Sequence, residues 1–344
     1  MKALVLESNG SLLFKNVPDP EPDKPDSILV RILAVGVCGS DVPRAFAHGA
    51  YHYPIILGHE FSGEVVESPK GSAFTRGAPV VVFPLLPCHH CLPCGTGDYA
   101  QCTDYDYFGS RRDGGFAELV WVPEENLFSI PDGTTYAHAA FAEPCAVALH
   151  GICKLPIAPG DSAVVYGAGP VGNLAAQWLR IRGCRDIMLV DVDTRKLLIA
   201  EEMGFLAVNP NVEDPVQRCF EQTDGQGADH GVEACGLPIT FQQALQSTTR
   251  RGNVLFMGNL TGTFSLEEAV FSQILRKEIH IHGTWNSRIQ PRGHDDWTTA
   301  LKHIDSGVQV SRLISHEVNL EKGAEVLHNM ATGNGFHNKV ILLP

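Results

Sequence analysis

The segment from Ser162 to Asp191 constrains the fold of this chain more than any other. An apolar run, Ser162–Tyr166, is followed directly by three glycines with the spacing Gly-x-Gly-x-x-Gly, and then by a helical pattern at 173–182. A second apolar run, at 187–190, ends at Asp191. A strand, a glycine turn, a helix and a second strand in this order predict a βαβ unit that begins a parallel sheet.

The glycine turn indicates what this unit binds. It consists of Gly167, Ala168, Gly169, Pro170, Val171 and Gly172. Its glycines permit a tight turn and let a pyrophosphate approach the N-terminus of the following helix. An acidic residue about 20 positions further on can bind both hydroxyls of an adenosine ribose, and Asp191 has that place. We therefore predict a dinucleotide site.

Asp191 also predicts which dinucleotide binds. A carboxylate at this place would repel a 2′-phosphate, so NAD is expected rather than NADP. Arg195 and Lys196 follow within a few residues and weaken this discrimination, which leaves partial use of NADP open. We count both among the candidate cofactor contacts.

The alternation of strands and helices continues and predicts a doubly wound parallel sheet. Helices are expected at 195–203, 215–222 and 239–248, and strands at 207–209, 230–234 and 253–258. Both chain ends are richer in strands: period-two alternation marks 27–35, and mixed segments follow residue 271, with strands at 278–284, 313–318 and 339–343 and helices at 296–306 and 320–331. This α/β pattern predicts a Rossmann unit at 149–271 inserted between two pieces of a second domain, 1–148 and 272–344.

Four cysteines form the clearest metal motif. Cys88, Cys91, Cys94 and Cys102 lie within residues 88–102, with gaps of two, two and seven residues. Short gaps let thiolates converge on one cation, and four sulfur ligands suit a closed, structural zinc site. The alternative is disulfides or buried thiols, but the chain begins without a secretory signal, and in that setting such spacing favours metal.

A second metal site is expected around Cys38 and His59. Each lies beside a glycine, where the backbone can bend to aim a ligand, and together they supply two zinc ligands. A catalytic zinc site has a third protein ligand and an exchangeable water, and Glu60 and Glu143 are the candidates. Pro144 marks a helix start, however, so the pattern alone favours Glu143 as a carboxylate placed there by the helix dipole.

Composition excludes some partners. The chain has 344 residues, which predicts about two domains, and a formal charge of −13. No Lys/Arg-rich run offsets that charge, so nucleic acid is not expected as a partner. No apolar run approaches the roughly 18 residues of a membrane helix, and the N-terminus is not a signal peptide. A cytoplasmic protein without a membrane partner is expected.

The segment 109–118 contains two adjacent arginines in a glycine-rich setting. Its sequence predicts a charged hairpin turn in which Asp113-Gly114-Gly115 supplies positive φ values. That turn does not require Arg111 and Arg112. Because Arg binds phosphate in a bidentate manner, these side chains are candidate phosphate ligands.

Across essentially its whole length the chain resembles the zinc-dependent medium-chain dehydrogenases, in their polyol branch. The resemblance rests on Cys38-Gly39-Ser40-Asp41, Gly58-His59-Glu60, the four-thiol segment, 113–118, Glu143-Pro144 and the glycine turn. It implies a GroES-like, strand-rich catalytic domain around the Rossmann unit, and a homodimer or homotetramer. It also implies that Cys38, His59 and Glu143 surround a catalytic zinc, with Glu60 behind them or as an alternative ligand and Ser40 in a proton relay.

These residues predict an enzyme with two zinc ions per chain, one catalytic and one structural. The expected reaction is NAD-dependent oxidation of a secondary hydroxyl of a sugar alcohol phosphate, of the galactitol 1-phosphate type, to a ketose phosphate. Candidate substrate contacts are Arg44, Arg111, Arg112, Trp285 and Asn286. Three alternatives stay open: a dehydrogenase of free polyols whose arginines form only ion pairs, a non-catalytic dinucleotide sensor, and a zinc-ribbon nucleic-acid binder, which the lack of a basic stripe disfavours.

Overall fold

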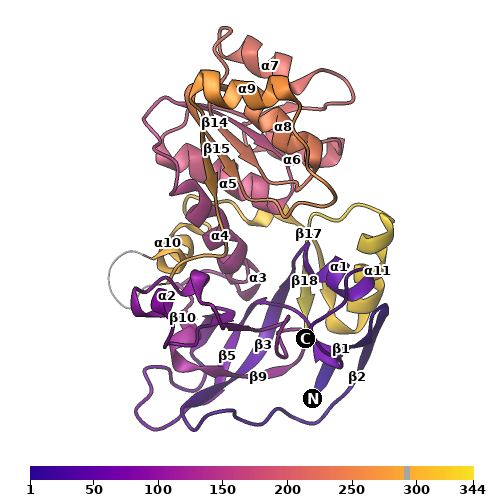
Figure 1. Cartoon of the computed structure of the whole chain (residues 1–344). Coiled ribbons are helices and arrows are strands. Elements are labelled where there is room, and N and C mark those ends of the chain that lie inside the picture. The colour runs from indigo at the N-terminus through magenta and orange to yellow at the C-terminus, as the bar shows by residue number, and fades with distance from the viewer. Residues whose placement is uncertain (290–294) are drawn as a thin grey trace. The chain divides into compact units, whose positions relative to one another are not determined.

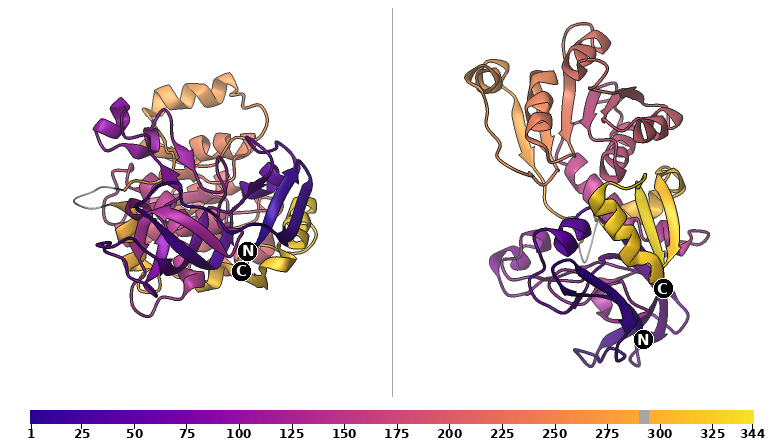
Figure 2. Two further views of the ribbon diagram at one scale, coloured as in Figure 1. Left: turned by 90° about the horizontal axis from the view of Figure 1, so that it is seen from below. Right: turned by 90° about the vertical axis from the view of Figure 1, so that its right-hand side faces the viewer.

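The computed structural model describes residues 1–289 and 295–344 (Figure 1). The chain divides into two compact units, one made of Met1–Glu143 and Arg288–Pro344 and the other of Pro144–Ser287. The division falls within helix α4 (Ala142–Ile152). Both chain ends belong to the first unit (Figure 2). Among the described residues, none of the helices has the length and apolar content needed to cross a bilayer.

The first unit is built around strand β3 (Ser27–Val37), whose alternating residues are buried. It pairs with β5, β9 and β18 in a sheet of order β10-β6-β5-β3-β18-β17, with β9 beside β3. The other strands are β5 (Glu60–Glu67), β6 (Pro79–Val82), β9 (Leu119–Pro123), β10 (Leu127–Ser129), β17 (Ile314–Asn319) and β18 (Lys339–Leu343). Ile341 of β18 lies opposite Gly36 of β3, which brings Lys339 to the end of β3.

Two small sheets and several short helices complete this unit. The sheets are β2-β1-β4, made of β1 (Lys2–Ser8), β2 (Ser11–Asn16) and β4 (Ile55–Ile56), and the pair β7 (Leu85–Leu86) and β8 (Asp106–Tyr107). The helices are α1 (Asp41–Phe46), α2 (Leu92–Gly95), α3 (Tyr136–Ala139), α10 (Asp296–His303) and α11 (Gly323–Thr332). The aromatic ring of Trp297 in α10 packs against Phe83 and Phe128, with ring centroids 5.3 and 5.5 Å apart.

The second unit is a parallel sheet with helices on both faces (Figure 2). Its order is β13-β12-β11-β14-β15-β16, so the direction of winding reverses between β11 and β14. The strands are β11 (Ser162–Tyr166), β12 (Asp186–Val190), β13 (Leu206–Val208), β14 (Ala228–Glu233), β15 (Thr248–Phe256) and β16 (His280–Gly283), and the helices are α5 (Pro170–Arg182), α6 (Thr194–Glu202), α7 (Pro215–Gln222), α8 (Pro238–Ser247) and α9 (Glu268–Lys277).

Two expectations from the sequence differ from the structure. Helix α9 is absent from the predicted elements, although Val270, Phe271, Ile274 and Leu275 in its sequence recur four residues apart, as in a helix. In the segment 109–118 the positive φ lies at Gly109, not at Gly114 or Gly115. A Cβ at Gly114 would clash with the carbonyl oxygen of Gly58, so this glycine serves a close approach of two backbones.

Candidate metal centres and dinucleotide site

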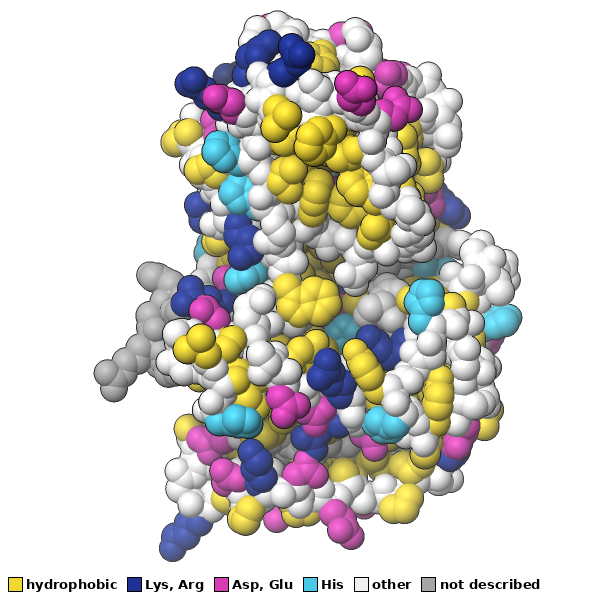
Figure 3. Space-filling view, viewed as in Figure 1, with side chains coloured by type: hydrophobic (Ala, Val, Ile, Leu, Met, Phe, Trp, Pro, Cys, Tyr) yellow, Lys and Arg dark blue, Asp and Glu magenta, His cyan; other side chains and the backbone are white. Residues whose placement is uncertain are grey.

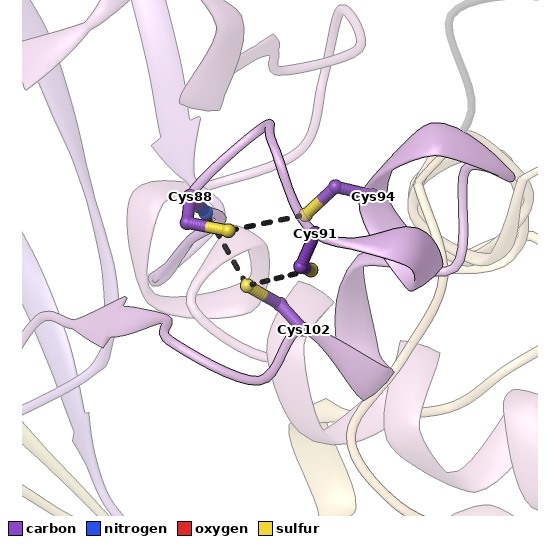
Figure 4. Close-up of side chains that lie close together, drawn as sticks. All are labelled: Cys88, Cys91, Cys94 and Cys102. Carbon is purple, nitrogen blue, oxygen red and sulfur yellow. Dashed lines mark hydrogen bonds between the residues drawn. The ribbon is translucent and has the colours of Figure 1, made fainter.

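The four thiols of residues 88–102 meet at one point (Figure 4). The Sγ atoms of Cys88 and Cys94 are 3.9 Å apart, and those of Cys91 and Cys102 are 3.8 Å apart. Four sulfurs bound tetrahedrally at about 2.3 Å from a zinc ion lie roughly 3.8 Å from one another. The thiol arrangement therefore fits zinc, and four ligands leave no position for a substrate.

A second group forms where β3 ends and β5 begins. Gly36 of β3 pairs with Glu60 of β5, so Cys38 and His59 come to the same end of the sheet. One ligand atom each from Cys38, His59 and Glu60 lies within 4.8 Å of the others. Thiolate, imidazole and carboxylate are the donor set of a catalytic zinc site.

Asp41 orients this group from behind. It is fully buried, accepts a hydrogen bond from the backbone N–H of Cys38 at 3.0 Å, and has Oδ1 3.4 Å from Nδ1 of His59. Burial alone would lower the pKa of His59, but Asp41 and Cys38 together raise it well above its usual value. A carboxylate facing Nδ1 leaves Nε2 as the nitrogen that can reach a cation, and it increases the basicity of the ligand.

Glu60 is held by a buried lysine. Nζ of Lys339 forms an ion pair with Oε2 of Glu60 and donates to the carbonyl of Val37 at 3.3 Å, and both charged side chains are nearly inaccessible, at 3% and 1% exposed. A Cβ at Gly36 would clash with the Glu60 carboxylate, so the pair fits only because position 36 is a glycine.

Glu143 approaches the metal group through a tyrosine. The hydroxyl of Tyr107 donates to Oε1 of Glu143 at 3.2 Å, and the Tyr107 ring packs edge-on against His59 with centroids 5.7 Å apart. Burial raises the pKa of Glu143 to about 7, although His59 opposes this shift. Glu143 is not part of the set whose ligand atoms lie within 4.8 Å of one another, so its role as third ligand stays a prediction.

The glycine turn of the second unit joins β11 to α5. Gly169 caps α5 and Pro170 is its first residue, followed by Val171 and Gly172. A Cβ at Gly172 would clash with the carbonyl oxygen of Gly167, so the turn closes only with glycine there. The helix N-terminus and its free N–H groups are suited to a pyrophosphate.

Asp191 lies beside this turn. Its Oδ2 accepts a hydrogen bond from the backbone N–H of Ala168 at 2.9 Å. Nζ of Lys196 is 3.9 Å from the same carboxylate, whereas Arg195 pairs with Asp193 at 2.7 Å. Asp191, predicted to bind the ribose hydroxyls, thus also connects the glycine turn to the end of β12.

Comparisons with known proteins agree with this geometry. Residues 24–132 match the family model of the alcohol dehydrogenase GroES-like domain, and residues 170–306 match that of the zinc-binding dehydrogenases. Galactitol 1-phosphate 5-dehydrogenase of Escherichia coli (strain K12) is 33% identical over 347 residues, which cover 100% of both chains. The chain belongs to the zinc-dependent medium-chain alcohol dehydrogenases. It is an oxidoreductase. A further relative of this dehydrogenase is the sorbitol dehydrogenase of Halalkalibacterium halodurans, which is 33% identical, with 100% of this chain and 99% of that chain covered.

Solved structures show the same fold as this medium-chain dehydrogenase. The crystal structure of galactitol-1-phosphate dehydrogenase from Escherichia coli superimposes with a TM-score of 0.92 at 32% identity, with 100% of each chain covered. A zinc-binding dehydrogenase from Sinorhizobium meliloti 1021, solved with NADP, gives a TM-score of 0.92 at 30% identity, with 100% of this chain and 99% of that chain covered. The GroES-like and Rossmann architecture expected from the sequence is confirmed.

The candidate substrate residues of the dehydrogenase are dispersed. Arg44, on α1, has Nη1 3.5 Å from Oδ1 of Asp41, which itself lies behind the metal group. Arg111 and Arg112 line a cavity of ≈ 400 Å³ that also contains His52 and Asp23, and that cavity includes none of the metal-ligand candidates. Arg112 forms an ion pair with Asp23. Carboxylates already balance two of these three arginines.

The remaining predicted site residues have defined places. Ser40 donates from Oγ to Sγ of Cys38 at 3.3 Å. Trp285 is 47% exposed, and Asn286 has a φ of +53° and a buried Nδ2 without a hydrogen-bond partner. Both follow β16 in the second unit, at the carboxyl edge of its sheet.

Sequence reasoning did not assign roles to three residues of the metal group in the dehydrogenase: Asp41, Tyr107 and Lys339. Asp41 ends the motif 38–41, and an acid three residues after a candidate ligand cysteine could have been predicted to lie near the metal group. Nothing in the sequence marks Tyr107 or Lys339, because each reaches the group only through strand pairing.

On the face in Figure 3, the Lys and Arg side chains of the first unit are mixed with Asp and Glu.

Proposed function

We propose that this dehydrogenase oxidises a secondary hydroxyl of a sugar alcohol phosphate with NAD as hydride acceptor, and so produces a ketose phosphate. The observation that carries this proposal is that one chain contains both a Cys38–His59–Glu60 metal group and a glycine turn bonded to Asp191. The name of the Escherichia coli relative supplies the substrate class. A homodimer or homotetramer in the cytoplasm is part of the same proposal.

In this proposal Cys38 and His59 would hold the catalytic zinc, with Glu143 or Glu60 as third ligand. A zinc ion held there would supply Lewis-acid chemistry that makes a substrate hydroxyl easier to deprotonate, as zinc lowers the pKa of bound water to about 7 in other enzymes. Asp41 keeps His59 in a single orientation from Nδ1. The Ser40 hydroxyl, which lies against Cys38, takes the substrate proton towards solvent. Lys339 forms an ion pair with the Glu60 carboxylate next to the metal group.

Asp191 supports NAD as the cofactor. Its carboxylate lies at the phosphate turn, where a 2′-phosphate would meet a like charge. Arg195 is engaged by Asp193, so Lys196 is the nearer cation for any residual use of NADP. The Sinorhizobium relative was solved with NADP, which makes the ratio of kcat/KM for the two cofactors the measurement of choice.

Arg44 is the best candidate for the substrate phosphate. It is 21% exposed and shares Asp41 with His59, which places its guanidinium next to the metal group. We expect galactitol 1-phosphate to give a kcat/KM at least about tenfold above those of sorbitol and xylitol, because an Arg–phosphate contact is worth about 1.5–3 kcal/mol. Arg44→Leu should raise KM for the phosphorylated substrate alone, and Arg111→Leu, in the separate cavity, is the matched control.

A dehydrogenase of free polyols is the second candidate. The observation in its favour is the ion pairing of Arg44 with Asp41 and of Arg112 with Asp23, which reduces the positive charge offered to a phosphate. The sorbitol dehydrogenase relative is equally similar in sequence. A kcat/KM for sorbitol or xylitol well above that for galactitol 1-phosphate would favour this candidate. In that case Arg44→Leu should leave KM unchanged.

A further inference from the structure

Glu233 is a buried carboxyl group of the second unit that the proposed reaction does not use. It is the last residue of β14 and is 0% exposed. Because β14 pairs in parallel with β11, Glu233 lies at the same edge of the sheet as the glycine turn. An isolated charge away from water is costly, so the partners of this carboxyl group show what it holds in place.

Three donors converge on one oxygen of Glu233. The backbone N–H groups of Cys235 and Gly236 donate to Oε1 at 2.8 and 2.7 Å, and the hydroxyl of Thr240 donates at 2.7 Å. Cys235 and Gly236 belong to the connection from β14 to α8, whose residues 234–237 we call the first turn, and Thr240 lies in the first helical turn of α8. The side chain of Glu233 therefore fixes the path of the first turn.

The same residue holds the connection that leaves β15, whose residues 257–261 we call the second turn. The backbone carbonyl of Glu233 accepts hydrogen bonds from Met257 at 2.9 Å and from Gly258 at 3.1 Å. A Cβ at Gly258 would lie 2.5 Å from Oε2 of Glu233. The N–H of Thr261 donates to the carbonyl of Gly236 at 2.8 Å, so the two turns are also joined directly.

The sheet order shows which part of a dinucleotide these turns face. The glycine turn and Asp191 follow β11 and β12, on one side of the point where the winding reverses. A dinucleotide crosses that point, and its second half lies over the ends of the strands on the other side, β14 and β15. A Cβ at Gly167 would lie 3.0 Å from Sγ of Cys235, so the first turn continues the surface of the glycine turn.

Neutral donors balance the carboxyl group. Burial raises the pKa of Glu233, while the Thr240 hydroxyl and the backbone N–H groups of Gly236, Cys235 and Gly258 lower it. All three donors meet Oε1, and Oε2 is buried without a hydrogen-bond partner among the described residues. An amide of the same size could accept at Oε1, but its two N–H donors would then be buried at the Oε2 position without a partner. The arrangement therefore depends on a carboxyl group rather than on side-chain volume.

We propose that Glu233 is a positioning residue for hydride transfer, which holds the first and second turns in the arrangement that the nicotinamide half of the dinucleotide requires. This inference rests on the proposed function, because it presumes that the second unit binds a dinucleotide across its sheet. Glu233 acts through the turns and touches no reacting atom.

Glu233→Gln tests this role by calorimetric titration with two ligands. NADH carries both halves of the dinucleotide, whereas ADP carries only the adenosine half and its phosphates. We expect Kd for NADH to rise about tenfold, because the buried N–H donors of the amide would lack acceptors and displace the turns. Kd for ADP should stay within about twofold, since the glycine turn and Asp191 are unchanged. Glu268→Gln, an exposed carboxylate at the start of α9, is the matched control and should alter neither Kd.

Thr240→Val provides a second test that keeps the carboxyl group and the side-chain shape. It removes one of the three donors to Oε1, and we expect a rise of roughly threefold in Kd for NADH alone. This variant decides the question if Glu233→Gln does not fold. Equal weakening of NADH and ADP, or an unchanged Kd for NADH, would overturn the role of Glu233. A wild-type chain that binds neither ligand would overturn the proposed function itself.

Discussion

At the scale of single residues, the buried ion pair of Lys339 with Glu60 is expected to have a large effect on stability. Lys339→Met would leave the Glu60 carboxylate buried without its partner, which costs about 3–5 kcal/mol in comparable pairs. We expect the free energy of unfolding, measured with denaturant, to fall by that amount. Lys15→Met, which breaks the half-exposed pair with Glu7, should cost less than about 1 kcal/mol. Equal losses in the two variants would contradict this account of the buried pair.

Asp191 is predicted to govern the choice of cofactor. Asp191→Ala removes the charge that repels a 2′-phosphate and the acceptor for the N–H of Ala168. We expect KM for NAD to rise about tenfold and the ratio of kcat/KM for NADP over NAD to increase by more than that. Steady-state kinetics with both cofactors at one fixed substrate concentration measure this. An unchanged ratio would mean that another group, such as Lys196, sets the preference.

At the scale of elements, the four-thiol segment 88–102 is predicted to stabilise the fold without taking part in the reaction. Its helices, α2 and a 3₁₀ helix at Tyr99–Gln101, have only four and three residues, so we expect metal ligation to hold the segment together. Cys94→Ser should reduce bound zinc from two ions to one per chain and lower Tm by several degrees. The surviving folded fraction should keep its KM for NAD. A variant that retains two zinc ions would show that these thiols do not bind one.

The elements also show what a sequence can and cannot reveal. The βαβ unit, the glycine turn and the thiol cluster are local patterns, because each contact is made within about thirty residues and leaves a periodic trace. Helix α7 (Pro215–Gln222) and strand β18 (Lys339–Leu343) have the bounds expected from the sequence. Lys339 meets Glu60 across 279 positions, through the pairing of β18 with β3, and that pairing has no local signal. The role of Glu233 is equally hard to predict from the sequence, since its hydrogen-bond partners belong to the segments that follow two different strands, β14 and β15.

At the scale of the whole molecule, the two metal sites should respond differently to a chelator. Of the described residues, Cys38, His59 and Glu60 would supply three ligands at one site, whereas four thiols would surround an ion at the other. Dialysis against dipicolinate should therefore reduce zinc from two ions to one per chain and abolish NADH production. NAD affinity, measured by calorimetry, should persist, because the glycine turn and Asp191 belong to the second unit. Added Zn²⁺ should restore turnover. Undiminished NADH production at one zinc per chain, with the thiol site still loaded, would contradict a catalytic zinc between Cys38 and His59.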